Sequence, residues 1–396
     1  MTTLLEVTVD GLAGRTDSIN IPLRRDINIF FGLNGSGKTS LLKLLHSSLT
    51  GNSADVVGLP FNSATVRFFS SYREREYKRT LDLEHPRSKS SLVVRRSYRE
   101  YQQALERASE QDPTISQDVL ANFARYGLET SEWKTTPSDD ELSGLRHRYL
   151  STNRLIGDAI PLPRGGGAHI TETELDAVFS QQIEAVWRLY TNRVLTEVTD
   201  VQSAGLREIL RSLLFTSSEP TEQSAPEVRK AYERASHFLV RRPARQNSAE
   251  FLEFKRRFNE EPHFRSVVQD IDQIERRIAQ AEAPRRKLAE LISSFFSEGK
   301  NLRFTNHEIQ AEVRGQRIPL AAMSSGEKQL VRILIEVIMT EDDLIIIDEP
   351  ELSMHIDWQR NLVSAMRTVN PRAQIIMATH SPDIMENVPD ECIFRL

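Results

Sequence analysis

The chain has 396 residues, of which 39% are hydrophobic and 27% are charged, and its formal net charge is −5 at pH 7. This composition fits a soluble globular protein that is long enough for two or three domains. It excludes a protein that coats nucleic acid over its whole surface, although a local basic patch is compatible with it. The single cysteine, Cys392, excludes an internal disulfide framework.

The sequence has no pattern typical of a membrane span or a secretion signal. The aliphatic run from Leu344 to Ile347 is far shorter than the ~20 residues that cross a bilayer. The N-terminus lacks the basic start and apolar core of a signal peptide. We therefore expect a cytoplasmic protein with no membrane partner.

The N-terminal region contains a glycine-rich loop between a predicted strand and a predicted helix. Strands are expected at 4–9, 19–23 and 27–31, and the third leads into Gly-Leu-Asn-Gly-Ser-Gly-Lys-Thr at 32–39. Helical spacing then continues through residue 46. This order is the context that a phosphate-binding loop requires. Glycines let backbone N–H groups point at phosphate oxygens, Lys38 is expected to reach the β- and γ-phosphates, and the Thr39 hydroxyl is expected to bind Mg²⁺.

The middle of the chain, from residue 72 to about 300, reads as charged helices separated by loops. Residues 172–198 carry an apolar stripe typical of an amphipathic helix. Apolar residues then recur at alternating steps of three and four between Phe264 and Phe295. This pattern predicts a coiled coil or a long helical hairpin, and an amphipathic helix inside a bundle is the alternative. Pro284, beside Arg285 in the seam, is expected to kink or interrupt the helix.

Strands return after residue 300. A hairpin is expected at 301–304 and 309–313, helices at 329–339 and 357–368, and buried strands at 344–347 and 374–378. The alternation of strands and helices predicts a largely parallel sheet.

Three candidate chemical residues follow these late strands. Asp348 ends the first strand, where a carboxylate can hold Mg²⁺ through water, and Glu349 suits the general base that polarises an attacking water. His380 follows the second strand, where it is expected to face the ligand crevice near the γ-phosphate. The sequence Ser324-Ser325-Gly326-Glu327 precedes a helix and would, taken alone, be an ordinary helix cap.

The order of these motifs resembles that of the ATP-binding cassette (ABC) ATPases. The residues within the motifs resemble those of the RecF, SMC and OLD-like branch. The resemblance rests on 32–39, 323–327, Asp-Glu-Pro-Glu at 348–351, the segment 350–355 and Ala-Thr-His-Ser-Pro around His380. It covers about 1–75 and 300–396. It implies an α/β fold in which a P-loop NTPase head of the ABC type is assembled from both chain ends. Residues 76–299 would form a large, mainly α-helical, coiled-coil-like insertion.

The resemblance also implies how the motifs work. Members of this class bind two ATP molecules between two heads, so Ser324 and Gly326 would touch the γ-phosphate held by a partner subunit. Residues 353–355 would line the dimer seam. The catalytic residues would be Glu349, His380 and Lys38, and Thr39 and Asp348 would bind Mg²⁺. The expected ATP-binding residues are Asn34, Gly35, Ser36, Gly37, Lys38, Thr39, Ser40, Ser324, Ser325, Gly326 and Glu327.

The sequence also departs from the transporter pattern. Met323, Ser325 and Glu327 stand where transporters have Leu, Gly and Gln. Transporters also have a glutamine that contacts the nucleotide site (the Q-loop). No glutamine follows the strand at 65–70 here, so Ser70 or Ser71 is left for that contact. A transporter is disfavoured because 285 positions separate Thr39 from Ser324. OLD-type nucleases carry a TOPRIM nuclease domain after the ATPase, and only 16 residues follow His380.

Two functions remain. The first is the ATPase component of a bacterial antiphage defence system of the PARIS or Septu type. Its heads would pair or oligomerise, its insert would sense or hold a partner, and a separate effector such as a nuclease would act in trans. The alternative is a RecF- or SMC-like DNA repair or chromosome-maintenance ATPase that binds DNA directly. The Arg- and Lys-rich stretch at 73–107, with Arg95, Arg96 and Arg99, motivates this alternative, although interleaved acids also fit a solvated helix face.

Overall fold

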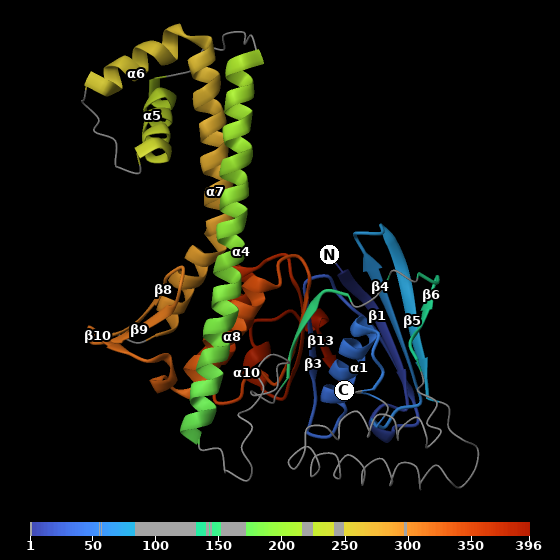
Figure 1. The fold of residues 1–396 in the computed structure, drawn as a ribbon. Helices are drawn as coiled ribbons and strands as arrows, with labels where there is room; N and C mark the ends of the chain where they lie inside the picture. Colours follow the sequence, from blue (N-terminus) through green and yellow to red (C-terminus); the bar gives the residue numbers. More distant parts are fainter. Residues whose placement is uncertain are drawn as a thin grey trace, which may run out of the picture. The chain divides into compact units, whose positions relative to one another are not determined.

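The structure of the chain is a computed structural model in which two compact units are described. The described residues are 2–54, 56, 58–83, 132–139, 142, 145–151, 172–215, 225–240, 249–296 and 299–396. The first unit, called the head unit here, comprises the described residues within Met1–Ile183, Phe295–Lys300 and Ala311–Leu396. The second, called the helical unit, comprises those within Glu184–Ser294 and Asn301–Gln310. The chain is thus an α/β protein whose head draws on both chain ends and whose insertion is helical (Figure 1).

A five-stranded parallel sheet forms the centre of the head unit. Its strand order is β13-β3-β12-β11-β7, and every neighbouring pair is parallel. Continuous aliphatic runs allow the central strands to be buried on both faces. The strands are β3 (Ile27–Phe31), β7 (His147–Leu150), β11 (Leu344–Asp348), β12 (Gln374–Thr379) and β13 (Ile393–Arg395).

A second, antiparallel sheet in the head unit has the order β2-β1-β4-β5-β6. In β4 the side chains alternate, and Ala64, Val66 and Phe68 face the core. Strands β5, β6 and β7 fall in the residue range for which charged composition favoured helices. The strands of this sheet are β1 (Thr2–Asp10), β2 (Ser18–Pro22), β4 (Ser63–Ser70), β5 (Arg75–Asp82) and β6 (Lys134–Thr136).

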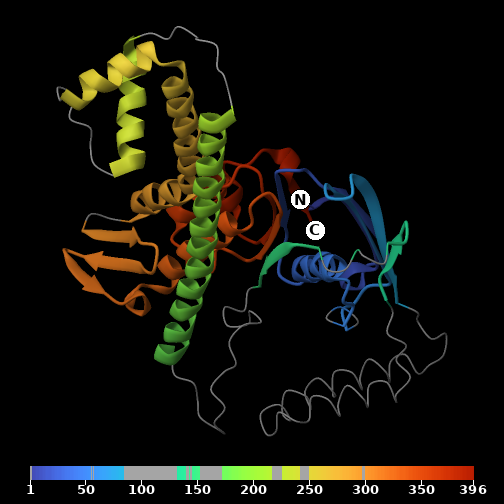
Figure 2. The same cartoon turned by 45° about the horizontal axis from the view of Figure 1, so that its top comes forward.

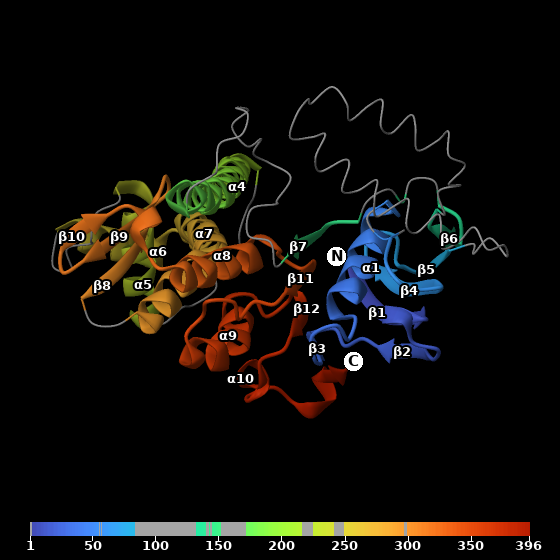
Figure 3. The same ribbon diagram turned by 90° about the horizontal axis from the view of Figure 1, so that it is seen from below.

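Helix α1 (Lys38–Thr50) lies between the two sheets (Figure 3). Its leucines at 41, 42, 44, 45 and 49 are at most 1% exposed, which explains why it is apolar on more than one face. At its C-terminal end, the buried guanidinium of Arg79 donates to the carbonyl oxygens of Ser48 and Leu49. Burial lowers the pKa of Arg79. The helix that follows the phosphate loop is therefore fixed along its whole length.

The remaining elements of the C-terminal half are helices that flank the parallel sheet and a small hairpin sheet. The hairpin sheet has the order β10-β9-β8, with β8 Lys300–Phe304, β9 Ile309–Val313 and β10 Gln316–Ile318. The helices are α8 (Ser325–Met339), α9 (Ile356–Val369) and the short α10 (Pro382–Met385). Single 3₁₀ turns lie at Leu12–Gly14, Leu320–Ala322 and Asp390–Cys392.

The helical unit consists mainly of two long helices that run side by side (Figure 2). Helix α4 (Glu172–Phe215) begins in the head unit and continues into the helical unit, and α7 (Pro262–Phe295) is the second helix. The predicted seam is present, since Ile271, Ile274 and Ile278 of α7 pack with Val201 and Ile209 of α4. Helix α7 continues through Pro284, so the predicted interruption does not occur. Arg285, the polar seam position, donates a hydrogen bond to Asn306.

Two shorter helices, α5 (Ala225–Val240) and α6 (Ala249–Glu260), complete the helical unit. Val228 of α5, Phe258 of α6 and Val268 of α7 form a small shared core. In the described part of the chain, no helix has the length and hydropathy that crossing a membrane would require.

Candidate functional site

The phosphate loop lies at the carboxyl end of β3, directly before α1. Gly35 and Gly37 have φ values of 84° and 98°, in the left-handed region that favours glycine. The Lys38 side chain turns back over the loop, and its Nζ donates to the carbonyl oxygens of Gly32 and Leu33 at 2.8 and 3.0 Å. The lysine is 5% exposed. The loop therefore holds its cation inward, next to its own backbone.

Two further features of this loop fit a phosphate group. The Ser36 hydroxyl oxygen is buried and has no hydrogen-bond partner. Asn34 and Gly35, at the tip of the loop, are exposed. Gly32 allows a close approach, because a Cβ there would lie 2.7 Å from the backbone oxygen of Leu396. An unpartnered hydroxyl beside a lysine at a helix N-terminus is a suitable environment for phosphate oxygens.

The expected metal-binding pair is brought together across the sheet. The Thr39 hydroxyl, in the first turn of α1, donates to the carboxylate of Asp348 over 3.2 Å, although 309 positions separate the two residues. Asp348 ends β11 and is 2% exposed. Ser40 follows Thr39 in the same helix and is half-buried. A hydroxyl and a carboxylate are oxygen ligands of the kind that Mg²⁺ takes, so these residues fit a Mg²⁺ site.

Glu349 and His380 lie next to this pair, at the carboxyl ends of β11 and β12. Glu349 has a φ of 48°, unusual for a residue with a side chain, and its backbone N–H donates to the Ala378 carbonyl over 2.9 Å. The Glu349 side chain is 23% exposed and that of His380 is 45% exposed. Nδ1 of His380 is 3.9 Å from Glu349 Oε1, which is too long for a hydrogen bond.

Glu351 is a site-lining residue to which the sequence reasoning assigned no role. Its Oε1 accepts from the Thr379 hydroxyl at 2.7 Å and from the His380 backbone N–H at 2.9 Å. His380 Nδ1 lies 3.1 Å from the same oxygen. The sequence feature that marks this position is the second acid of Asp-Glu-Pro-Glu at 348–351.

The residues of the signature motif, Ser324 to Glu327, are held by local contacts. Ser324 is the N-cap of α8, and with Glu327 it forms a reciprocal capping box. Lys300 pairs with Glu327 at 2.6 Å. Gly326 is packed so closely that a Cβ would lie 2.1 Å from the backbone oxygen of Ser353. The helix-cap interpretation is thus correct, and the cap also contacts the segment that follows Glu351.

The structure brings some of the predicted site residues together and leaves others apart. Lys38, Thr39, Asp348, Glu349 and His380 lie at the carboxyl ends of β3, β11 and β12, which are neighbours in the parallel sheet. Among the residues described, no hydrogen bond or ion pair joins the signature residues to the phosphate loop of the same chain.

The strand beside β11 was not predicted. Leu150 of β7 pairs with Ile347 of β11, so Ser151 follows at the same edge as Asp348. Ser70, which the sequence offered for this position, belongs to β4 of the antiparallel sheet and pairs with Thr2 and Arg75. The contact from Ser70 or Ser71 therefore stays a prediction. Strand β7 was not predicted because its four residues have too little apolar periodicity to be recognised.

Part of the basic stretch proposed for DNA binding lies outside the described residues. Arg73 pairs with Asp139 at 3.7 Å, and residues 84–107, including Arg95, Arg96 and Arg99, are outside the described part. The DNA-binding hypothesis thus stays a prediction.

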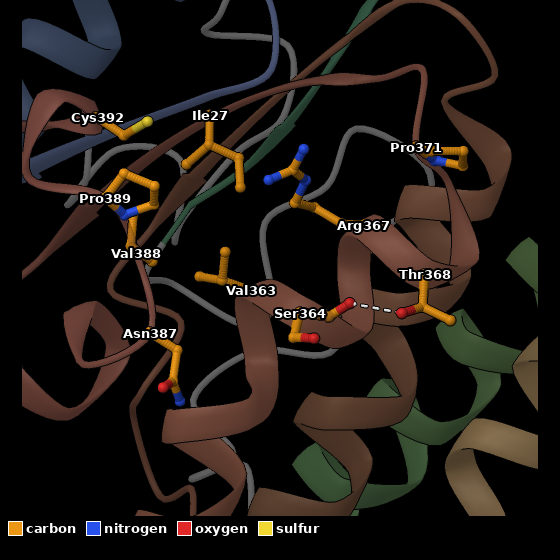
Figure 4. A pocket seen from close by; sticks show the side chains of 10 residues that line it. All are labelled: Ile27, Val363, Ser364, Arg367, Thr368, Pro371, Asn387, Val388, Pro389 and Cys392. Atoms are coloured by element: carbon orange, nitrogen blue, oxygen red, sulfur yellow. Dashed lines mark hydrogen bonds between the residues drawn. The ribbon is translucent and has the colours of Figure 1, made fainter.

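A pocket of about 400 Å³ lies away from the nucleotide loop, beside Ile27, the first residue of β3 (Figure 4). Val363, Ser364 and Arg367 of α9 line it, together with Cys392. Burial raises the pKa of the Cys392 thiol. The predicted site residues are at the other end of β3, so this pocket is separate from them.

Two protein families match parts of the chain. The family described as "AAA domain, putative AbiEii toxin, Type IV TA system" matches residues 196–386, and a family described as "AAA domain" matches residues 12–152. Together the two ranges contain the phosphate loop, the signature motif, Asp348, Glu349 and His380. Both matching families are thus described as AAA domains, and their ranges lie in the N-terminal and C-terminal parts of the chain.

Two curated relatives share short segments with the chain. A probable ATPase of retron Vc95 from Vibrio cholerae serotype O1 biovar El Tor is 27% identical over 92 residues, which are 20% of this chain and 18% of the relative. The Septu protein PtuA from Bacillus thuringiensis is 40% identical over 45 residues, 11% of each chain. The match thus spans less than a fifth of either relative. The predicted resemblance to ATPase components of defence systems is confirmed, since Septu is one of the two types named.

Among solved structures, similar chains are SMC head domains. The Pyrococcus furiosus head with an extended coiled coil, bound to the C-terminal domain of ScpA, gives a TM-score of 0.41 at 15% identity, covering 98% of this chain and 92% of that one. The SMC head domain from Thermotoga maritima gives 0.40 at 12% identity, covering 97% and 91%.

Proposed function

We propose that this chain binds and hydrolyses ATP between two head units that face each other. One observation carries the proposal: Lys38, Thr39 and Asp348 are assembled at one site, whereas the signature residues are ordered separately by their own cap. A site that needs both sets is completed when a second head supplies the signature. Ser324, Ser325, Gly326 and Glu327 would then face the γ-phosphate of the partner's ATP, with Ser353 to His355 in the seam.

Within one head, the roles follow from chemistry and position. The Lys38 ammonium would exchange its two carbonyl contacts for phosphate oxygens, and the backbone N–H groups of Asn34 to Ser40 would bind the rest of the phosphate chain. Thr39 and Asp348 would hold Mg²⁺, which when bound neutralises charge on the β- and γ-phosphates. Glu349 is the general base for water, and His380 contacts the γ-phosphate region.

We further propose that the ATPase head consists of residues 1–75 and 300–396 together with strands β5, β6 and β7, and that the helices within 76–299 form the insertion that senses or holds a partner. The chain would be the ATPase component of a bacterial antiphage defence system, with an effector such as a nuclease acting in trans. The match to a family described as a putative AbiEii toxin and the similarity to a retron ATPase and a Septu protein support this role. Two long helices with a core of their own suit a sensor.

The central test uses Glu349→Gln, which keeps the side-chain shape but removes the base. We expect ATP binding to persist, hydrolysis to fall by at least about 100-fold, and an ATP-dependent dimer to accumulate. Phosphate release and light scattering after gel filtration measure both effects. In Lys38→Ala, ATP binding should weaken on the order of 100-fold because the phosphates lose a charged donor, whereas Lys43→Ala on the same helix serves as the control.

Hydrolysis by Glu349→Gln at the parental rate would show that another group is the base. A head that stays monomeric with ATP in both proteins would contradict the shared site. Co-purification with the product of a neighbouring gene supports the effector in trans. Duplex DNA binding that weakens steeply with salt, in the absence of such a partner, would instead favour the DNA-repair alternative.

A further inference from the structure

Glu351 is a buried acid that follows β11 and contacts the residues at the end of β12. Its side chain is 4% exposed. All three of its contacts, with the Thr379 hydroxyl, the His380 N–H and the His380 ring, fall on Oε1, while Oε2 is buried and has no partner. Buried carboxylate oxygens without partners are rare because desolvation opposes them, so this arrangement calls for a role.

The side chain of Glu351 contacts His380 and the residue before it. Its oxygen holds His380 by the backbone N–H at 2.9 Å and by ring Nδ1 at 3.1 Å. Thr379, before His380, donates to the same oxygen, and its hydroxyl accepts from the Ser381 N–H at 3.0 Å. The backbone on both sides of His380 is therefore tied to one carboxylate.

Glu351, rather than Glu349, is the acid that orients the His380 ring. The distance from Nδ1 is 3.1 Å to Glu351 but 3.9 Å to Glu349, and only the shorter one is within hydrogen-bond range. A carboxylate acceptor at Nδ1 fixes a proton on that nitrogen and leaves Nε2 without one, so that Nε2 can accept a hydrogen bond from a donor such as water. Because its carboxylate is free of the histidine, Glu349 stays available to a water molecule.

We propose that Glu351 is the positioning residue of this ATPase: it fixes the tautomer and direction of His380, so that the unprotonated Nε2 accepts a hydrogen bond from the water that attacks the γ-phosphate. The inference rests on the proposed function, because it assigns Glu351 a role at the same nucleotide site. The proposal gives different roles to two acids that lie two residues apart. Glu349 would act on water, and Glu351 would act only through His380.

A double-mutant cycle tests this division, with ATP hydrolysis and ATP binding measured for each variant. We expect His380→Ala to lower kcat about 100-fold and Glu351→Ala about 30-fold, with little change in ATP affinity. Glu351→Gln keeps an acceptor without the charge and should lower kcat about 5-fold. In the His380→Ala background, either change at position 351 should have less than about a 2-fold further effect, because residues acting as a unit are not additive.

The control is Glu391→Gln, the same substitution at a carboxylate that is 64% exposed, and it should leave kcat unchanged. If the effects at 351 and 380 multiply, Glu351 acts independently of His380 and the proposal is overturned. The same holds if Glu351→Ala raises only the apparent KM. Should Glu351→Ala fail to fold, the cycle with Glu351→Gln decides alone.

Ring nitrogen NMR supplies a readout that does not depend on turnover. In protein labelled with ¹⁵N-histidine at pH 8.5, the signal lost in His380→Ala identifies the ring among the nine histidines. It should report a proton on Nδ1 in the parental protein and on Nε2 in Glu351→Ala. An unchanged tautomer overturns the positioning role. A parental chain that never hydrolyses ATP but shows this shift would contradict the proposed function and leave the positioning of His380 supported.

Discussion

Each unit has a glycine at which an added Cβ would meet a neighbouring atom, but the neighbour is of a different kind in each. In the head unit, a Cβ on Gly326 would lie 2.1 Å from the backbone oxygen of Ser353. In the helical unit, a Cβ on Gly205 would lie 2.3 Å from the Cδ1 and Cγ1 atoms of Ile274. A side chain can rotate away, whereas a backbone oxygen moves only with its segment. Main chain therefore limits the packing at Gly326, whereas a side chain limits it at Gly205.

The surfaces of the helices follow the same contrast. Helix α1 buries its leucines between two sheets, while α4 in the helical unit leaves Leu189 and Leu206 62% and 54% exposed. Exposed side chains of this kind are held by fewer contacts, so substitutions in this part of α4 should cost less. Three substitutions test this contrast, in order of decreasing effect.

Gly326→Ala should produce the largest change, because the added methyl meets a backbone oxygen. We expect a loss of about 3 to 4 kcal/mol in the free energy of unfolding of the head, above the usual range for overpacking. Hydrogen exchange should rise in α8 and in residues 350–355. Ser325→Ala, one residue earlier in the same turn, controls for helix propensity. A Gly326→Ala protein as stable as that control would show that the segment at Ser353 can move.

Acid should weaken the head through a half-buried histidine. Burial lowers the pKa of His147 to about 4, and His147 Nε2 lies 2.6 Å from Nδ1 of His46. An unfolded histidine titrates near 6.5, so the unfolded chain takes up the proton first as the pH falls. The stabilisation by neutral His147 is present above pH 6.5 and is lost towards pH 4, by about 2 kcal/mol after allowing for partial exposure of the ring.

The measurement is the unfolding free energy between pH 7 and 4 for the parental protein and for His147→Gln, which should have the flatter profile. His263→Gln, at an exposed histidine of the helical unit, is the matched control and should retain the parental slope. Identical slopes in all three proteins would mean that His147 is accessible to solvent.

The motif-bearing parts of the head were predictable because their chemistry fixes both residue type and spacing. The phosphate loop, the strand ending at Asp348 and the strand before His380 are all where the sequence indicated. The seam of α7 was predictable for a different reason, since the spacing of its apolar residues alone specifies which of them face the partner helix.

Other features could not be read from local sequence because they depend on pairing across the chain. Strand β7 owes its conformation to its neighbour β11, and its four residues show no apolar alternation. The role proposed for Glu351 rests on its contacts with Thr379 and His380, which lie 28 and 29 positions away. The continuity of α7 through Pro284 shows that helix packing outweighs the local penalty of proline.

Gly205→Ala should have the smallest effect, although the methyl starts 2.3 Å from its neighbour. Alanine gains about 1 kcal/mol over glycine in a helix, and overpacking costs about 1 to 3 kcal/mol, so we expect a net loss of about 1 kcal/mol. Ser203→Ala on the exposed face of α4 gives the propensity gain alone. Ile274→Val removes Cδ1, so it should cost less in the Gly205→Ala background than in the parental protein, as unfolding and hydrogen exchange of α4 and α7 would report. If Gly205→Ala instead destabilises as much as Gly326→Ala, the helices cannot adjust their side chains, and the two units are equally rigid.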